Sequence, residues 1–206
     1  MTSTSGRREY VRLQDIAEEV TVGHVGSTTE YYRDQGVPFL RTQNVGDRCI
    51  ILKDLRFVDQ EFHGRLAKSS LACGDVVLSR VVSDRVNCAV IPKELHGSNC
   101  ANVIKVRPGK LLDSRYLLHY LSNPELQSSL MQRQVGSAQA VVNTAVLKQC
   151  SVPVVPLAEQ RRIAAILDKA DATRRKREEG IRLTEELLRS TFLEMFGDPE
   201  TNPKEL

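Results

Sequence analysis

Residues 158–196 read AEQRRIAAILDKADATRRKREEGIRLTEELLRSTFLEMF, and this stretch decides which architecture the chain can have. It contains no proline and one glycine, Gly180, and is dominated by Ala, Glu, Arg, Lys and Leu, which have high helix propensity. We therefore predict one long helix, or two helices in line. At ~1.5 Å rise per residue it would extend roughly 58 Å, which is longer than the interior of a domain of this size requires.

An apolar seam follows this predicted helix in steps of four and three residues, from 163 to 170 and again from 181 to 188, which is coiled-coil spacing. Arginines occupy the two seam positions in between, so the middle of the helix is polar. A helix does not present such a stripe to water without a partner. Either it folds back on its own domain, or, as we favour, it pairs antiparallel with a helix of another copy or of a second repeat. The seam consists of Ile163, Leu167, Ala170, Arg174, Arg177, Ile181, Thr184, Leu188, Phe192 and Met195.

The overall composition is that of an ordinary globular protein, with 41% apolar and 27% charged residues in 206. This excludes disordered, collagen-like and low-complexity classes, and the length indicates one domain plus an appendage. The sequence contains no apolar run near the roughly 20 residues of a membrane-spanning helix, and its N-terminus does not show a signal-peptide pattern. We expect a cytoplasmic protein with no membrane partner.

The cysteines and histidines do not form a metal-binding pattern. The five cysteines, an odd number, are spread along the chain without a CxxC pair. None of the four histidines is separated from a cysteine or from another histidine by a spacing typical of metal ligands. We expect no metal site, no disulfide framework and a reducing compartment. The net charge of +3 permits a nucleic-acid partner without requiring one, so any basic patch has to be local.

Four regions follow from these patterns. Residues 1–9 are small and polar and are expected to be flexible. Residues 10–157 alternate β-rich runs with turn signals and a few helical segments, which is typical of a mixed α+β domain. The long helix over 158–196 follows, and 197–206 form a tail or linker.

Local signals within the α+β domain predict its main elements. Helical spacing begins after Asp113 or Ser114, either of which can cap the helix, is broken at Asn123-Pro124 and resumes as far as Gln134. Asn143-Thr144 is expected to cap a short helix. Residues 93–99 are predicted to connect two paired strands. The clearest predicted strands are 37–41, 75–80, 88–91 and 101–106, each bounded by Gly, Pro, Asn or Asp.

The most specific pattern lies at the end of this domain. Gly136-Ser137-Ala138-Gln139 is followed by Asn143-Thr144 and Leu147-Lys148, and residues 152–163 then read VPVVPLAEQRRI. This order is similar to the junction between target recognition domain and conserved helix in the DNA specificity (S) subunit of type I restriction-modification systems, which usually reads Pro-x-Pro-Pro-Leu-x-Glu-Gln. Val155 replaces one of its prolines. Residues 36–45 and 74–80 resemble the first half of the same domain, so the resemblance covers nearly the whole chain.

The resemblance implies a non-catalytic subunit that reads a bipartite DNA site. In the family, two recognition domains are held apart by two antiparallel helices, on which two methyltransferase (M) subunits dock. Those subunits use S-adenosylmethionine to methylate adenine, and motor-nuclease (R) subunits that use ATP and Mg²⁺ cleave unmethylated DNA. This chain itself is expected to bind no cofactor. It has one recognition domain and one helix where the family has two of each, which implies a half subunit that either forms a homodimer or is a first half.

Three polar segments supply the side chains that double-stranded DNA recognition needs, because Arg or Lys reads guanine and Asn or Gln reads adenine in the major groove. The first follows a predicted strand at 41–44, the second is the predicted loop 80–87, and the third is the stretch 133–143 with its small residues. The candidate DNA-binding residues are Arg41, Thr42, Gln43, Asn44, Arg80, Ser83, Arg85, Asn87, Arg133, Gln134, Ser137, Gln139 and Asn143.

Motifs of catalysis do not appear in the sequence. It has no GxxxxGK[ST] loop, no Asn/Asp-Pro-Pro-aromatic motif for adenine methylation and no GxSxG elbow, so we expect no catalytic residues. Asp168, Asp171 and Lys176 lie on a charged helix, where a solvated face is the better interpretation. Two alternatives remain open: the recognition module of a fused restriction-methylation enzyme, and a coiled-coil adaptor without DNA contact.

The run 161–177 holds seven basic residues against two acidic ones. Three interpretations of this basic run stay open, namely contact with the phosphates of spacer DNA, docking of an acidic methyltransferase surface, and simple solvation. The salt dependence of DNA binding distinguishes them, because each phosphate contact contributes about 0.9 to the slope of log affinity against log salt.

Overall fold

The computed structural model describes residues 9–82, 85–133 and 140–197. The chain divides into two compact units, 1–164 and 165–206. The first unit mixes helices with four small sheets, and one long helix begins in it and makes up the described part of the second. This confirms the predicted α+β class with a long C-terminal helix. Within the described residues, no helix is both long and apolar enough to span a membrane.

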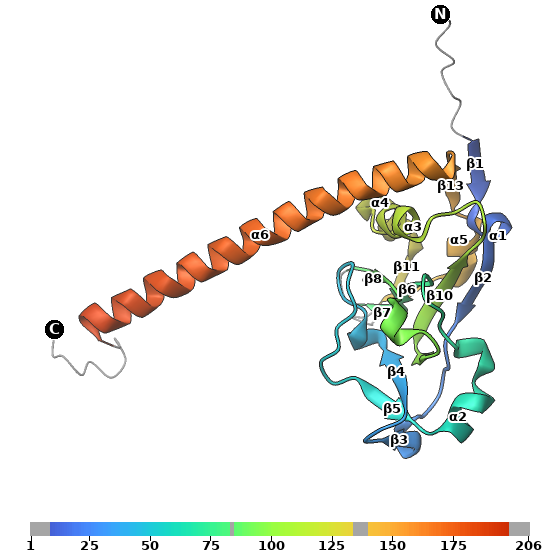
Figure 1. Cartoon of the computed structure of the whole chain (residues 1–206), viewed down its shortest axis with the longest axis horizontal. Helices are drawn as coiled ribbons and strands as arrows, with labels where there is room; N and C mark the ends of the chain where they lie inside the picture. The colour runs from blue at the N-terminus through green and yellow to red at the C-terminus, as the bar shows by residue number, and fades with distance from the viewer. Residues whose placement is uncertain (1–8, 83–84, 134–139, 198–206) are drawn as a thin grey trace, which may run out of the picture. The chain divides into compact units, whose positions relative to one another are not determined.

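A four-stranded antiparallel sheet forms the centre of the first unit (Figure 1). Its inner strands are buried on both faces, and successive residues point to opposite sides. Val76 and Leu78 join a cluster that includes three leucines of a covering helix, whereas Val77 joins a second cluster on the opposite face. In spatial order the strands are β2 (Ala17–Val22), β10 (Val103–Pro108), β6 (Val76–Ser79) and β8 (Cys88–Val90).

A smaller sheet at one end of this unit carries its own core around Phe39, Val58 and Phe62 (Figure 1). Its last two strands are parallel, with Leu40 opposite Cys100, so residues distant in sequence lie side by side. In spatial order the strands are β3 (Tyr32–Arg33), β5 (Arg56–Val58), β4 (Val37–Arg41) and β9 (Asn99–Ala101), and α2 (Gln60–Arg65) follows β5 along the chain. Short 3-10 turns η1 (Thr29–Tyr31), η2 (Thr42–Asn44), η3 (Ala67–Ser69) and η4 (Lys93–Leu95) link these elements.

Two further strand groups complete the first unit. At the opposite end, β1 (Glu9–Arg12) pairs antiparallel with β13 (Ser151–Val154), with Glu9 opposite Val154, and α1 (Leu13–Ile16) follows β1. The last group is the sheet of β11 (Met131–Arg133), β12 (Ala140–Val142) and β7 (Val81–Val82) in that order.

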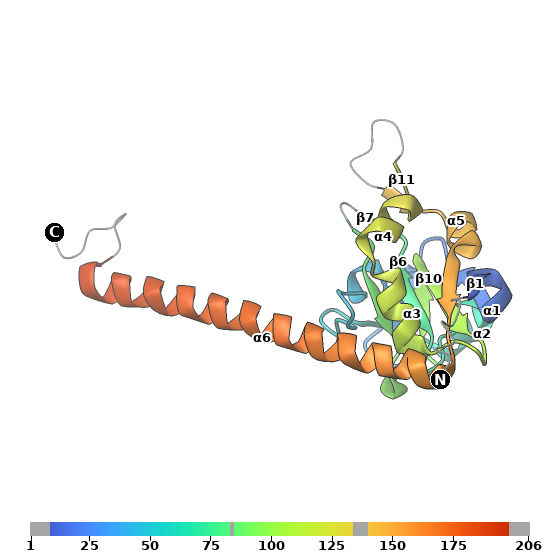
Figure 2. The same cartoon turned by 90° about the horizontal axis from the view of Figure 1, so that it is seen from above.

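The helices that cover the central sheet begin where their capping residues predict. α3 (Ser114–Leu121), α4 (Pro124–Leu130) and α5 (Thr144–Gln149) have the N-caps Asp113, Asn123 and Asn143, whose side-chain oxygens accept backbone N–H bonds. Pro124 begins α4, so the predicted break at 123–124 is confirmed. The helix ends at Leu130 and not near Gln134 as predicted, because residues 131–133 pair with β12 as strand β11. Both α3 and α4 lie over the same side of the central sheet (Figure 2), and their leucines belong to one hydrophobic cluster with Val76 and Leu78.

The long helix α6 spans Leu157–Phe196, as the sequence predicted to within one residue. Its first two turns belong to the first unit, where Gln160 is fully buried. The Gln160 amide oxygen accepts from the Asp113 backbone N–H at 2.8 Å, and its nitrogen donates to the carbonyls of Leu111 and Val155, both at 2.8 Å. These three bonds fix the start of α6 to the recognition domain.

Two strand predictions were wrong. The expected strand 101–106 is divided at Asn102, whose φ of 52° ends β9 and lets β10 join a different sheet. Residues 93–99 therefore do not connect two paired strands, because they lead from β8 of the central sheet to β9 of the small sheet. β6 lies between β8 and β10.

Candidate DNA interface

Two of the three predicted DNA-reading segments meet at Asn102. η2 with Thr42 follows directly after β4, and Arg80 follows directly after β6. The Thr42 hydroxyl donates to the Asn102 carbonyl at 2.8 Å, and the Arg80 backbone N–H donates to the same carbonyl at 3.3 Å. Strand pairing thus brings together two segments that lie far apart in the sequence.

A polar hollow of about 160 Å³ opens beside this junction. Arg41 is half-buried and its Nη2 donates to the Asp54 carbonyl at 2.8 Å, whereas Gln43 is exposed. The hollow therefore presents a guanidinium, a hydroxyl and an amide, which are the donors and acceptors that bind base edges and phosphates. Its lining residues are Gly26, Thr28, Tyr32, Arg41, Thr42, Gln43, Ala101 and Asn102.

Tyr32 contributes an aromatic ring to the lining of the hollow, with two arginines near it. The guanidinium carbons of Arg41 and Arg56 each lie 5.8 Å from its ring centroid, within cation–π range. Its hydroxyl lies 2.7 Å from the Thr28 hydroxyl, which fixes the ring. Sequence reasoning missed Tyr32, because nothing in its local pattern shows that β3 and β4 share a sheet.

Asn44 has a structural role, which corrects its assignment as a base-reading residue. Its side chain is fully buried. Its Oδ1 accepts from the Arg41 backbone N–H at 3.0 Å, and its Nδ2 donates to the carbonyls of Ile51 and Lys53. The amide therefore braces the loop that carries the first segment and does not face a ligand. Asn143, in the third segment, is likewise engaged through its Oδ1 in capping α5.

The rest of the second segment lies beside the loop that follows η2. The exposed Arg85 Nη1 stands 3.7 Å from the Asp47 carboxylate, which also lies 3.9 Å from Arg48. Arg48 adopts a left-handed φ of 55° and its N–H donates to the Cys88 carbonyl. Asn87 is half-buried, and Ser83 lies outside the described residues. Two further arginines thus gather next to the first segment.

The third segment lies mostly outside the described residues, which end at 133 and resume at 140. Gln134, Ser137 and Gln139 belong to that undescribed stretch, and Arg133 is described only by its backbone in β11. The strands on either side are informative, because β12 pairs with both β11 and β7, opposite Val81 and Val82. The described ends of the third segment therefore lie next to the second segment.

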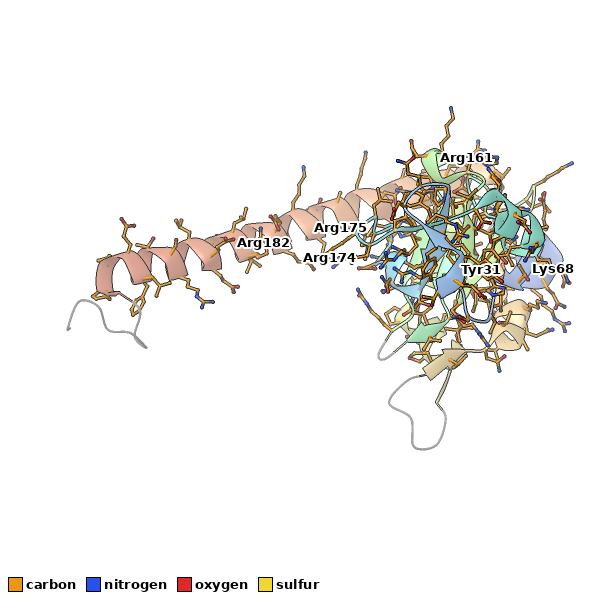
Figure 3. All side chains as sticks on the ribbon, turned by 90° about the horizontal axis from the view of Figure 1, so that it is seen from below. Tyr31, Lys68, Arg161, Arg174, Arg175 and Arg182 are labelled. Atoms are coloured by element: carbon orange, nitrogen blue, oxygen red, sulfur yellow. The ribbon has the colours of Figure 1, made fainter. Side chains whose placement is uncertain are left out.

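A larger hollow of about 500 Å³ is lined by His24, Arg65 and Lys68, among other residues. Behind it, the buried Lys105 Nζ lies 2.7 Å from Glu19 and donates to the carbonyls of Lys68 and Ser70. An ammonium group that is 2% exposed needs such partners, so Lys105 fixes the cationic wall of this hollow. Figure 3 labels Lys68 on this unit.

In the second unit, apolar side chains remain exposed along α6. Ile181, Leu188 and Phe192 are each more than half exposed, at seam positions that the heptad spacing predicted. Ion pairs run along the same helix, for example between Arg182 and both Glu179 and Glu186 (Figure 3). Such exposed pairs contribute little to stability. These three apolar side chains stay largely exposed in the described part of the chain, whereas Ile163, the first residue of the seam, is partly buried against the core of the first unit.

The fold is a mixed α+β domain followed by one long helix, and the comparisons specify the family. The family described as "Type I restriction modification DNA specificity domain" matches residues 7–183. The chain is 30% identical over 174 residues to a putative type I restriction enzyme MjaX specificity subunit of Methanocaldococcus jannaschii. The chain belongs to the type I restriction-modification DNA specificity family.

The alignment with that relative covers 79% of this chain and 39% of the relative. The chain thus spans about two fifths of the length of the curated relatives it matches. Solved structures show the same fold. An HsdS subunit from Thermoanaerobacter tengcongensis, at 22% identity, gives a TM-score of 0.57 over 84% of this chain and 39% of that one. A structure described under assembly of the type I R-M system gives a TM-score of 0.68 at 21% identity, over 92% of this chain and 45% of that one.

Proposed function

We propose that this chain selects the DNA sequence on which a type I restriction-modification complex acts, and that it does no chemistry itself. The observation that carries the proposal is the junction at Asn102, which lines the polar hollow together with residues 41–43 and is hydrogen-bonded by both Thr42 and Arg80. Arginine with its two parallel donors suits guanine, and a glutamine amide suits adenine. The hollow is therefore the proposed base-reading site, with residues 10–157 as the recognition domain.

The exposed stripe of α6 supports the second part of the proposal, a homodimer. A single helix with Ile181, Leu188 and Phe192 in water gains stability by burying them against a second helix. Two copies that pair antiparallel place two identical recognition domains about a twofold axis. Because protein symmetry is mirrored in the DNA site, this assembly reads an interrupted palindrome.

The partners follow from the same proposal. Cytoplasmic methyltransferase subunits dock on the paired helices and use S-adenosylmethionine to methylate adenine in the selected site. A motor-nuclease subunit that uses ATP and Mg²⁺ joins them to cleave unmethylated DNA. This chain holds neither cofactor in the proposal.

The test is co-expression of this chain with its methyltransferase subunit in a methylation-free host, followed by long-read mapping of modified adenines. A palindromic split motif is the expected result. An asymmetric motif would refute the homodimer and point to a second, different recognition domain. Absence of sequence-dependent methylation would refute the specificity function and favour an adaptor.

A pair of variants tests whether the hollow determines the sequence of the methylated motif. Arg41→Ala removes one guanidinium of the proposed reading site, and we expect the methylated motif to lose definition at the affected position. Arg12→Ala removes an exposed arginine from β1, in a sheet that does not include the reading segments, and is expected to leave the motif unchanged. Equal motifs for both variants would show that the hollow does not read bases.

A further inference from the structure

Asn102 is the single residue between β9 of the small sheet and β10 of the central sheet. β9 ends immediately before it, beside Arg41 of β4, and β10 begins immediately after it, beside Ser79 of β6. The next residue along each partner strand, Thr42 or Arg80, therefore lies next to Asn102. Its φ of 52° is a left-handed conformation that Asn adopts more readily than most residues with a side chain.

The contacts of Asn102 divide into backbone and side-chain bonds. Its N–H donates to the His24 carbonyl at 3.0 Å, and its carbonyl accepts from Thr42 and from the Arg80 N–H. Any residue that tolerates this φ makes those bonds. The side-chain oxygen Oδ1 instead accepts from Arg80 Nη1 at 3.4 Å, and this bond requires an acceptor at position 102.

The bond to Arg80 matters because an arginine recognises guanine through the orientation of its N–H donors as well as through its charge. Its two parallel N–H donors have to face the O6 and N7 acceptors together. Among the described residues, the Asn102 amide is the only side-chain partner of the Arg80 guanidinium. Asn102 also lines the hollow with Arg41 and Gln43, so it lies between the two groups of candidate reading side chains.

We propose that Asn102 is a positioning residue for specificity, which holds the Arg80 guanidinium in register with the segment 41–43. This inference rests on the proposed function and deepens it. Asn102 sets the base preference through Arg80, whereas the general affinity for DNA comes from the cationic side chains.

Two variants at one position separate this role from a structural one. Asn102→Gly keeps the left-handed backbone accessible and removes the side-chain acceptor, whereas Asn102→Asp keeps an acceptor oxygen at the same place. Each is assembled with the methyltransferase subunits and titrated with the mapped duplex, with duplexes altered at single base pairs, and with random DNA.

We expect the Gly variant to lose about tenfold of its preference for the mapped duplex, which is the value of one bidentate base contact, and to bind random DNA as the wild type does. The Asp variant is expected to keep its base discrimination, even though its negative charge weakens binding to every duplex. In an Arg80→Ala background, Asn102→Gly is expected to have no further effect on preference.

Three results would overturn the inference. The first is an equal loss on mapped and random DNA in the Gly variant, the second is additivity with Arg80→Ala, and the third is lost discrimination in the Asp variant. The Asp variant remains decisive if the Gly variant does not fold. A wild-type complex without base preference would refute the proposed function and this inference with it, whereas a selective wild type with an equally selective Gly variant would refute the inference alone.

Discussion

The buried amide of Gln160 gives the sharpest prediction for stability. Gln160→Leu keeps a side chain of similar size at a fully buried position but removes its three hydrogen bonds, each 2.8 Å long. A hydrogen bond contributes about 1 kcal/mol net, so the expected loss is about 3 kcal/mol. A native domain is stable by only ~5–15 kcal/mol, so this is a large fraction of the total.

Urea denaturation followed by far-UV circular dichroism measures this loss directly. At an m value of ~1–3 kcal/mol per molar urea, 3 kcal/mol lowers the midpoint by about 1–3 M with m unchanged. The melting temperature is expected to fall by roughly 6–12 °C. The matched control is Gln149→Leu, an exposed glutamine whose described side-chain bond is a 3.3 Å contact with Gln14, and it should stay within ~0.5 kcal/mol of wild type. A Gln160→Leu variant no less stable than this control would refute the argument that Gln160 anchors α6.

Two further predictions concern the helix stripe and the thiols. Leu188→Glu places a charge in the exposed stripe of α6 and is expected to convert a dimer to a monomer in light scattering, with the recognition domain still folded. At pH 8 two of the five thiols, Cys49 and Cys73, should react rapidly with a disulfide reagent, because both are exposed. Burial raises the pKa of Cys88 and of Cys100 to about 12, so both stay protonated and unreactive. Because the folded pKa is the higher one, their contribution to stability is intact below about pH 9 and is lost as the pH rises towards 12.

Controls distinguish these results from unfolding. Arg189→Glu changes an exposed charge on the same turn of α6 and should leave the dimer intact. Dissociation by both variants would show a general charge effect instead of a lost apolar contact. In denaturant all five thiols should react, and fast reaction of more than three in the native chain would contradict the burial of Cys88 and Cys100.

The elements that the sequence predicted are those whose signals are local. The helix over 158–196 follows from its lack of proline and its helix-forming composition, and the break at Asn123-Pro124 follows from the restricted backbone of proline. The caps Asp113 and Asn143 use their own side chains within three residues. Such features depend on neighbours along the chain, so one sequence is enough to place them.

The elements that the sequence did not predict depend on partners far along the chain. The parallel pairing of β4 with β9 joins residues near 40 to residues near 100, and no local spacing specifies it. Asn102 looks like one more residue of an alternating strand, although an asparagine inside an apolar run is a signal for a left-handed break. Lys105 reads as a solvent-facing strand residue, and its burial depends on Glu19 and on two carbonyls of another segment.

Residue type alone also could not assign roles within the candidate site. Asn44 and Asn143 were both predicted to read bases, because asparagine is a common adenine reader. The same short amide is equally suited to brace a turn, and the structure uses Asn44 in that way. Whether an asparagine faces a ligand depends on its burial, which a single sequence does not reveal.

The pairing of β1 with β13 has a consequence for how such a domain is built into larger proteins. The backbone enters the domain at Glu9 and leaves it at Val154, and these two residues lie opposite each other on neighbouring strands. The chain therefore enters and leaves the domain at neighbouring positions, so the residues between β1 and β13 form an insertion with adjacent ends. A different insert between those two strands would keep the entry and exit of the chain in place, provided that it also offers backbone partners to Gln160, as Leu111 and Asp113 do here.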